Sequence, residues 1–247
     1  MWEKKDAMPL VSRNTATPTP ARYDERGNLL IYVLLGIVLL GALTIAIRNT
    51  GGGADNIDRE AMIIKFNQIQ NHAAEFANGV KDVMASGLSE VDIRFAHPDA
   101  PIDYGTITTD PTHQVFGKSG GKATYRTPPE GINDGSPWEF YATSAIPYVG
   151  SDRADLIAVL PNVTEGFCQV VTSRLGFDAG TQPTDNASGA SPDCVQGTSS
   201  DRFTGTFQDV GANSLDETSF SQLPALQACV LCDSDSSYHY YYVLMAR

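Results

Sequence analysis

The longest apolar run of the chain lies near its N-terminus. Nineteen consecutive residues without a charge extend from Leu29 to Ile47. A helix of this length rises roughly 28 Å, which is close to the hydrocarbon thickness of a bilayer. The run is apolar on all sides, unlike a surface helix, and it is longer than the apolar part of a cleaved signal peptide. The pattern therefore predicts a transmembrane helix over 28–48.

The charges that flank this run predict its orientation. Five basic residues precede it: Lys4, Lys5, Arg13, Arg22 and Arg26. The nearest basic residues that follow are Arg48 and Arg59. The positive-inside rule therefore places residues 1–27, a leader predicted to be disordered, in the cytoplasm and residues 49–247 outside it. The predicted partner of the apolar helix is the lipid bilayer.

A second helical pattern follows a glycine-rich break predicted over 49–57. Between Asp58 and Ala85, apolar residues recur at alternating spacings of four and three, which is typical of an amphipathic helix with one continuous stripe. The stripe consists of Met62, Phe66, Ile69, Ala73, Phe76, Val80 and Val83. Either the chain's own sheet or neighbouring copies in an oligomer can cover this stripe, and its own sheet is the simpler expectation.

Short strand-forming runs separated by Gly, Pro and Asp turns occupy the rest of the chain. The predicted strands are Val91–Phe95, Gln114–Phe116, Ala123–Arg126, Trp138–Thr143, Leu156–Leu160 and a central final strand within Tyr238–Arg247. One more helix is predicted after Asn162, which forms a capping-box pattern with Glu165, and this helix ends near Gly176. The sequence therefore predicts an α+β fold, in which a transmembrane helix and an amphipathic helix precede an antiparallel-sheet head, the whole outer domain spanning 58–247.

All four cysteines, Cys168, Cys194, Cys229 and Cys232, follow the apolar run. An even number of cysteines in an oxidising compartment indicates disulfides. The Cys-x-x-Cys spacing at Cys229 also occurs in redox pairs and zinc sites, which stay open as alternatives, but no thioredoxin-like βαβ pattern surrounds it. Of three connectivities we expect Cys168–Cys194 with Cys229–Cys232, because each closes a local loop. The first of these loops corresponds to roughly 3–4 kcal/mol of stabilisation.

Charge is distributed unevenly along the chain. The net charge is −12; residues 1–27 contribute +1 from five basic and four acidic residues, and the other 220 residues contribute −13 from 12 basic and 25 acidic residues. An acidic domain without a basic stripe argues against a nucleic-acid partner and against binding to anionic lipid headgroups.

No motif in the sequence indicates catalysis. The segment Gly117–Gly121 matches the letters of the G-x-S-x-G nucleophile elbow, but the glycines after Ser119 predict a hairpin loop in place of the required helix. The histidines, which lack paired metal-ligand spacing, are His72, His97, His113 and His239. We therefore predict that the protein is not an enzyme and that it has no catalytic residue, cofactor or metal.

The start of the apolar run, Arg26-Gly-Asn-Leu-Leu-Ile-Tyr32, resembles the processing junction of type IV pilins and pseudopilins. The resemblance implies that a prepilin peptidase cleaves after Gly27 and that Asn28 becomes a methylated N-terminus. It also implies that the first helix anchors the subunit in the inner membrane and packs against other pilin-like subunits. The C-terminal domain is then periplasmic or part of a surface filament. Three blocks of the outer domain also look like an uncharacterised set of alphaproteobacterial pilin-like proteins: 129–138, 160–168 and 238–247.

One position departs from the filament-forming members of that family. They usually carry a glutamate five residues into the mature chain, which neutralises the amino terminus of a neighbouring subunit in the apolar core. Here that position is Tyr32, and the first mature residue is Asn28 rather than an aromatic residue. Since some minor subunits also lack the glutamate, the resemblance favours a minor pilin or pseudopilin of a type IV pilus or type II secretion-like assembly.

Three hypotheses for the function remain after these observations. The first is the minor pilin-like subunit, processed at Gly27 and assembled through its N-terminal helices. The second is an unprocessed single-pass protein whose outer domain binds a ligand, a glycan or an envelope partner. The third is an envelope enzyme that uses Cys229 and Cys232 as a dithiol. The sequence favours the first.

Overall fold

The structure is a computed structural model of the 247-residue chain. It describes residues 26–49, 52–177, 182–185, 194–209, 212–215 and 217–247, and the side chains of all of these except 26–30, 46–49, 52–57 and 217. Most of the predicted leader over 1–27 lies outside the described residues. Contacts divide the chain into two units, Met1–Gly53 and Ala54–Arg247, which are described separately.

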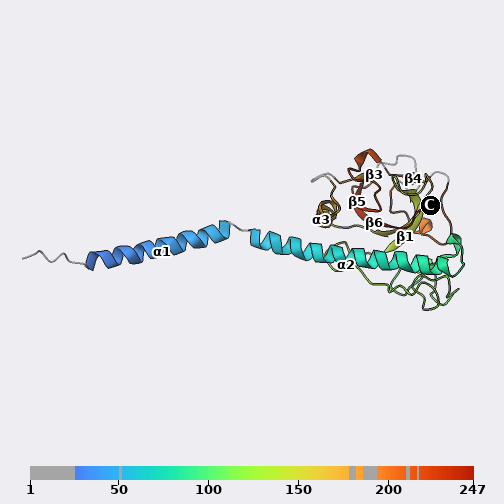
Figure 1. Ribbon diagram of the computed structural model, residues 1–247, viewed down its shortest axis with the longest axis horizontal. Coiled ribbons are helices and arrows are strands. Elements are labelled where there is room, and N and C mark those ends of the chain that lie inside the picture. Colours follow the sequence, from blue (N-terminus) through green and yellow to red (C-terminus); the bar gives the residue numbers. More distant parts are fainter. Residues whose placement is uncertain (1–25, 50–51, 178–181, 186–193, 210–211, 216) are drawn as a thin grey trace, which may run out of the picture. The chain divides into compact units, whose positions relative to one another are not determined.

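The first unit contains the helix α1 (Arg26–Asn49), shown in blue in Figure 1. Within the described part of the chain, no helix meets the length and apolarity that a membrane span requires. On this finding the transmembrane helix predicted over 28–48 is wrong. The single-pass inner-membrane location, with its cytoplasmic and periplasmic sides, rested on that helix and is wrong with it.

The helix α2 (Gly52–Ala85) has 34 residues, and all but its first two belong to the second unit. The glycine-rich break predicted over 49–57 is therefore too long, because a helix tolerates glycine at a cost of only about 1 kcal/mol per residue. The amphipathic helix predicted over 58–85 is confirmed. Six residues of its stripe are at most 1% exposed: Phe66, Ile69, Ala73, Phe76, Val80 and Val83.

The described residues of the second unit form six strands in one sheet, in the order β3-β5-β6-β2-β1-β4. They are β1 (Glu139–Ala145), β2 (Asp155–Leu160), β3 (Thr184–Asp185), β4 (Asn213–Ser214), β5 (Gln227–Cys232) and β6 (Tyr238–Met245). The four longer strands pair antiparallel, and β6 occupies the predicted central position. The two-residue edge strands pair parallel to their neighbours, so the prediction of a purely antiparallel sheet is wrong at both edges.

The two edges of the sheet meet through a buried hydrogen bond. The side-chain amide of Asn213 in β4 donates to the carboxylate of Asp185 in β3 at 2.7 Å. Both residues are fully buried. The sheet is therefore nearly closed, and closure hides edges that would otherwise be able to pair with another chain.

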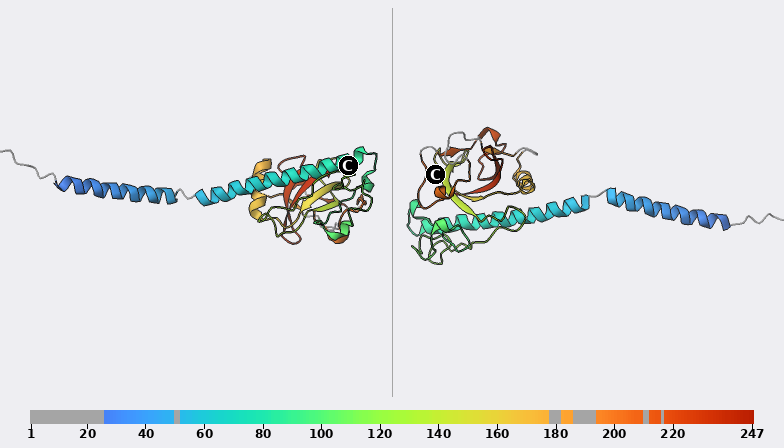
Figure 2. Two further views of the ribbon diagram at one scale, coloured as in Figure 1. Left: turned by 90° about the horizontal axis from the view of Figure 1, so that it is seen from below. Right: turned by 180° about the vertical axis from the view of Figure 1, so that it is seen from behind.

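Side chains along the central strands alternate between two apolar cores, as the two-residue period of a strand requires. Phe140, Ala158 and Tyr240 belong to the core beneath α2, whereas their neighbours Tyr141, Ile157 and Tyr241 belong to the inner core. The ring of Phe66 lies 6.2 Å from that of Tyr240, and Figure 2 shows α2 crossing this face of the sheet. The chain's own sheet thus covers the α2 stripe, as expected.

Three predicted strands do not form, although all of their apolar residues except Val91 are buried. They are Val91–Phe95, Gln114–Phe116 and Ala123–Arg126. This part of the chain contains turns, with an isolated bridge between Arg94 and Gln114. Phe95 and Val115 are nevertheless fully buried in the core beneath α2. The pattern therefore identified most of the buried residues, but these short, turn-bounded runs have no continuous strand to pair with.

The helix predicted after Asn162 is α3 (Glu165–Leu175), and it ends as predicted at Gly176, in the left-handed conformation. Its N-cap is Thr164, whose hydroxyl oxygen accepts a hydrogen bond of 3.3 Å from the Phe167 backbone N–H. The capping role predicted for Asn162 is wrong, because the Asn162 side chain instead donates to Asp134 at 2.8 Å. Four 3₁₀ helices complete the described elements: η1 (Glu90–Asp92), η2 (Ile102–Tyr104), η3 (Ser199–Asp201) and η4 (Glu217–Ser219).

Candidate functional site

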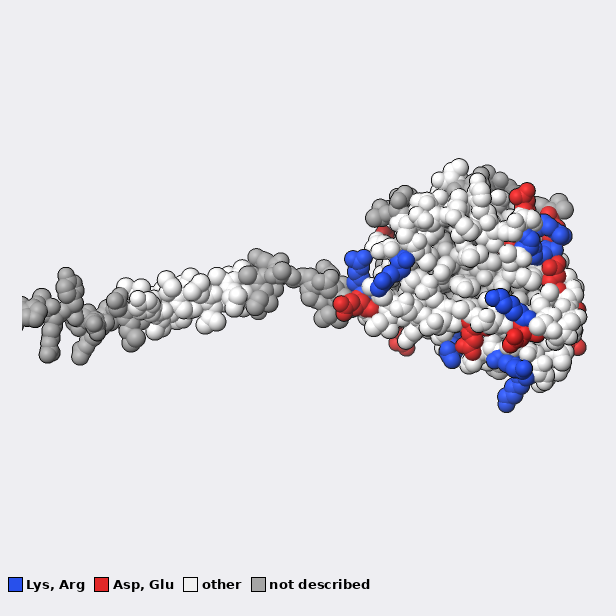
Figure 3. Space-filling view, in the orientation of Figure 1, with Lys and Arg blue, Asp and Glu red and all other residues white. Residues whose placement is uncertain are grey.

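The surface of α1 is the first candidate for a functional site. Eleven large apolar or aromatic side chains between Ile31 and Ile45 are 54–69% exposed. This stretch contains no charged residue, and the Thr44 hydroxyl donates to the backbone carbonyl of Leu40 at 2.6 Å. Figure 3 shows the described part of α1 as an uncharged surface, whereas the second unit carries both basic and acidic side chains. Monomeric proteins rarely expose a contiguous apolar surface of this kind, so α1 requires a partner.

The exposed side chains of α1 surround the helix and do not form a single stripe. Val38, Leu39 and Leu40 follow one another at intervals of about 100° around the axis. All three are at least 59% exposed. A partner that contacts one side of α1 would leave the other sides in water. A partner of α1 would therefore have to enclose the helix on all sides.

The predicted processing site lies at the start of this helix. Gly27 and Asn28 belong to α1, but they precede the residues whose side chains the structure describes, so their processing stays a prediction. Tyr32 is described and is 69% exposed. It places a phenol at the position where filament-forming members of the family that the sequence resembles usually carry a carboxylate.

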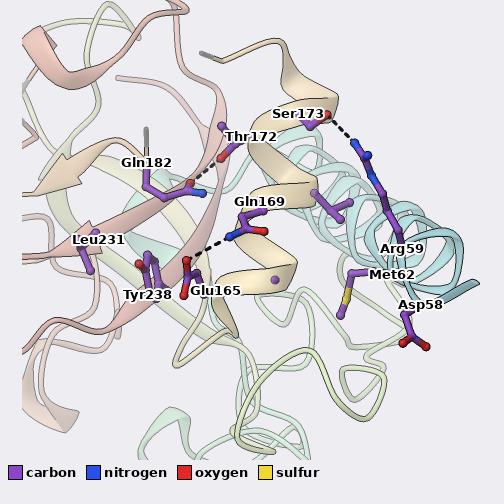
Figure 4. Close-up of a pocket in the computed structure, with 12 residues that line it drawn as sticks. Asp58, Arg59, Met62, Glu165, Gln169, Thr172, Ser173, Gln182, Leu231 and Tyr238 are labelled. Carbon is purple, nitrogen blue, oxygen red and sulfur yellow. Dashed lines mark hydrogen bonds between the residues drawn. The ribbon is translucent and has the colours of Figure 1, made fainter. Parts of the chain in front are cut away.

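A groove of about 780 Å³ in the second unit is the second candidate. Figure 4 shows its lining residues on both sides of α3, with Arg59 on the α2 side and Gln182 on the β5–β6 side. The polar side chains bond one another: Gln169 to Glu165 at 3.1 Å, Thr172 to Gln182 at 2.5 Å and Arg59 to Ser173 at 3.5 Å. The first bond lies within α3, the other two tie α3 to its neighbours, and the groups do not converge on a common point where a ligand would sit.

All four cysteines form disulfides, as predicted, but the expected connectivity is wrong. The bonds are Cys168–Cys229 and Cys194–Cys232. Cys229 and Cys232 lie three residues apart on β5, so their side chains point to opposite faces of the sheet. Cys229 belongs to the core beneath α2 and Cys232 to the inner core. The same geometry separates the two sulfurs that the dithiol-enzyme hypothesis requires to act together.

The observed disulfides close longer loops than the expected ones. Their partners are 61 and 38 residues apart in the sequence. Loop-closure entropy then assigns about 4 kcal/mol of stabilisation to each bond. Cys168–Cys229 fastens α3 to β5, and Cys194–Cys232 fastens the segment that begins at Cys194 to the end of the same strand. Both disulfides therefore have a structural role in the head.

A buried ionic cluster holds another loop against β1. The Glu139 carboxylate accepts hydrogen bonds of 2.5 Å from both Arg202 and the Tyr141 hydroxyl, and one of 3.3 Å from Gln196. Glu139 is only 5% exposed. Burying one charge without its partner would cost several kcal/mol, so the cluster fixes the loop that contains Arg202. Its groups are bonded to one another, which is the arrangement of a structural clamp.

Two other buried ionisable groups have pKa values displaced by burial. Burial raises the pKa of Asp155 to about 6, although its carboxylate accepts N–H bonds from Ile146 and Arg247. Burial lowers the pKa of His239 to about 4, so its imidazole is neutral near pH 7. Among the described residues, neither Asp155 nor His239 forms a hydrogen bond with another titratable side chain. Neither group is therefore part of an acid–base pair.

The loop predicted at Gly117–Gly121 is confirmed as a glycine-rich turn, but it does not join two strands of a hairpin, because the runs 114–116 and 123–126 do not form strands. No helix follows Ser119, so the nucleophile elbow is not formed. A Cβ atom at Gly121 would lie 2.4 Å from the carbonyl oxygen of Gly79 in α2. The glycine therefore permits the loop to pack directly on the helix backbone.

Among the histidines, His239 occupies a position that the sequence did not suggest. It is 1% exposed and lies next to the Cys194–Cys232 disulfide. The spacing of histidines along the chain could not reveal this neighbourhood, because Cys194 is far from His239 in the sequence. One signal was present: Cys232 and His239 flank a short turn between two strand-forming runs.

In comparisons with known proteins, no family model, no curated protein and no solved structure matches the chain.

Proposed function

We propose that this chain is a non-enzymatic, minor pilin-like subunit of a type IV pilus or type II secretion-like assembly. In this proposal α1 is enclosed by helices of neighbouring pilin-like subunits. The observation that carries the proposal is the exposure of apolar side chains on all sides of α1. Enclosing eleven such side chains would contribute on the order of 10 kcal/mol per subunit.

The head supports this division of roles between the helices. The stripe of α2 is already covered by the sheet beneath it, with Phe66 and Phe76 at most 1% exposed. This stripe is therefore unavailable to other subunits. The helix α2 holds the head, and α1 supplies the apolar surface that other subunits enclose.

Tyr32 supports a minor position in the assembly. A carboxylate buried in the filament core would need the positively charged amino terminus of a neighbouring subunit beside it at every position along the filament. Tyr32 is neutral and imposes no such repeat, so α1 is suited to a place among non-identical subunits.

The alternative function, binding of a ligand by the head, has no comparable support. The groove between α2, α3 and the β5–β6 hairpin has polar groups that bond one another, as Gln169 and Glu165 do. Ligand binding stays a prediction from the sequence.

The proposal is tested with the purified full chain by sedimentation velocity in the absence of detergent. We expect the wild type to form multimers and Leu39→Asp to shift the distribution toward the monomer, because a charge cannot be enclosed in an apolar helix bundle without a partner. The matched control is Ile102→Asp, at an apolar residue of the head that is 89% exposed. A monomeric wild type, or equal effects of the two substitutions, would contradict the proposal.

Processing is tested separately by mass spectrometry of the chain recovered from cells that contain a prepilin peptidase. We expect a methylated N-terminus at Asn28. An intact leader in that experiment would remove the processing step from the proposal, whereas the sedimentation result would still decide whether α1 mediates assembly.

A further inference from the structure

Tyr148, in the loop between β1 and β2, combines a strained backbone with an exposed side chain. Its φ is +59°, in the left-handed region that a bulky residue rarely adopts. The Val149 backbone N–H donates to the Ile146 carbonyl at 3.1 Å, so Tyr148 is the third residue of a β-turn. A positive φ at this position usually requires glycine or asparagine. Tyr148 is nevertheless 72% exposed, so packing in the head does not account for a tyrosine here.

The head fixes the turn on both sides of Tyr148. Ile146 and Val149 are at most 4% exposed. Gly150, at a φ of +60°, lies so close to the end of the chain that a Cβ atom there would be 2.0 Å from the Arg247 carbonyl oxygen. The surrounding residues therefore hold the backbone of Tyr148 in its strained conformation. Strain that is maintained in this way is a feature of binding sites.

A cavity of about 380 Å³ opens beside this turn. Its volume lies within the range of about 300–1,000 Å³ that small-molecule sites occupy. The side chains of its lining include Tyr148, Asp152, Asp209 and Ser214. The structure records no side-chain hydrogen bond from Asp152 or Ser214 to another described residue. In contrast to the groove beside α3, this cavity therefore has polar groups that are available to a ligand.

The charges around the cavity do not favour a strongly charged ligand. The Asp209 carboxylate accepts hydrogen bonds from Arg153 at 2.6 Å and from Arg247 at 2.8 Å, so its charge is compensated. Asp152 is then the one lining carboxylate without a guanidinium partner among the described residues. A calcium ion would need about 6–8 oxygen ligands. A quaternary ammonium group is typically held in a cage of aromatic rings, and Tyr148 is the one aromatic residue among the described residues of the lining.

We propose that this cavity binds a pyranose sugar, which stacks on the Tyr148 ring and donates hydroxyl hydrogen bonds to Asp152. A pyranose is neutral, and one face of its ring carries C–H bonds that contact the electron-rich face of an aromatic ring favourably. Its hydroxyls lie at the edge of the ring and suit an ionised carboxylate, which only accepts, and the Ser214 hydroxyl, which donates or accepts. The site lies within the second unit, so sugar binding goes beyond the proposed function and does not rest on assembly through α1.

The experiment measures the binding of three methyl glycosides to the full chain by saturation-transfer difference NMR, which tolerates multimers. The probes are methyl β-D-glucopyranoside, methyl β-D-galactopyranoside and methyl α-D-mannopyranoside. We expect at least one of them to bind with a millimolar Kd and to receive the strongest saturation at the C–H hydrogens of one ring face.

Substitutions at Tyr148 separate binding from folding. Tyr148→Gly removes the ring but suits the left-handed backbone, so we expect a thermal unfolding midpoint at least as high as that of the wild type. The same variant should bind the glycoside at least about tenfold more weakly. Tyr148→Phe keeps the ring face and should bind nearly as tightly as the wild type. The matched control is Lys122→Gly, at an exposed residue with a φ of +56° that does not line the cavity, and it should bind as the wild type does.

Four results would overturn the proposal. The first is that none of the three glycosides binds, and the second is that Tyr148→Gly binds as tightly as the wild type. The third is an equal loss of binding in Lys122→Gly. The fourth is that a tetralysine peptide binds more tightly than every glycoside and is released by Asp152→Asn, which would assign the cavity to a cationic partner. Sedimentation of Tyr148→Gly should give the multimer distribution of the wild type, so the outcome is distinguishable from a failure of assembly.

Discussion

The helices α1 and α2 are both long and rich in apolar residues, but they differ in where those residues lie. In α2 the apolar residues form one stripe, and Phe66 and Phe76 within it are at most 1% exposed. In α1 they occupy every side, and the large ones are at least 54% exposed. The difference indicates that α2 contributes to the stability of the head, whereas the described residues of the chain leave the apolar side chains of α1 exposed.

Substitutions at matched apolar positions of the two helices should separate these roles most strongly. Phe76 is fully buried against the rings of Phe116, Trp138 and Phe140. We expect Phe76→Ala to lower the free energy of unfolding of the head by about 3–5 kcal/mol, measured by urea denaturation. Leu39→Ala in α1 should change it by less than about 0.5 kcal/mol. Comparable losses in the two variants would remove the distinction between the helices.

The disulfide that fastens α3 should also affect the head without affecting assembly through α1. Replacing Cys168 and Cys229 by Ala should lower the free energy of unfolding by about 2–4 kcal/mol, because it releases a constraint on the unfolded chain. The multimer distribution of the variant, measured by sedimentation at a temperature where the head is folded, should equal that of the wild type. A shift to the monomer would show that assembly depends on the head.

The pH dependence of stability should likewise come from the head. Burial raises the pKa of Asp155 from 3.8 to about 6, so the folded state favours the protonated carboxyl. The resulting stabilisation is present below about pH 4 and is lost as the pH rises through 6, a total change of about 3 kcal/mol. Arg247 is the charged residue that moderates this shift.

Asp155→Asn isolates this effect from that of His239, which has the opposite sign. Burial lowers the pKa of His239 to about 4, so its contribution is lost as the pH falls. The quantity to compare is therefore the difference in free energy of unfolding between the wild type and Asp155→Asn at pH 4, 5, 6 and 7. We expect this difference to change between pH 4 and 6 and to be constant at higher pH. A flat difference would assign the pH dependence to other groups.

Local patterns predicted the parts of the fold that repeat with a regular period. The stripe that contains Phe66 and Phe76 gave α2, and the strand-forming residues gave β1, β2 and β6. Patterns of this kind report which side of an element is buried. They do not report which strand lies beside it. The parallel edge strands β3 and β4 were therefore not predicted, and Val91–Phe95, which makes only an isolated bridge through Arg94, was wrongly predicted to be a strand.

The cysteine pairing and the environment of His239 depend on tertiary structure in the same way. Once β5 is known to be a strand, its two-residue period excludes a bond between Cys229 and Cys232. The sequence-based expectation of local loops ignored that period. The neighbourhood of His239 depends on Cys194, which is close to it only in the folded head. The apolar character of α1 was evident from the sequence, but the extension of this character to a transmembrane helix was wrong.

The most direct test of the central claim compares α1 with the head in cells. A photo-activatable amino acid is placed at position 39 in one chain and at position 102, on the exposed surface of the head, in another. If α1 is enclosed by neighbouring subunits, irradiation should produce covalent adducts between protein chains at position 39 and few at position 102. Absence of protein adducts at position 39, or equal yields at the two positions, would contradict the claim that α1 is the assembly element.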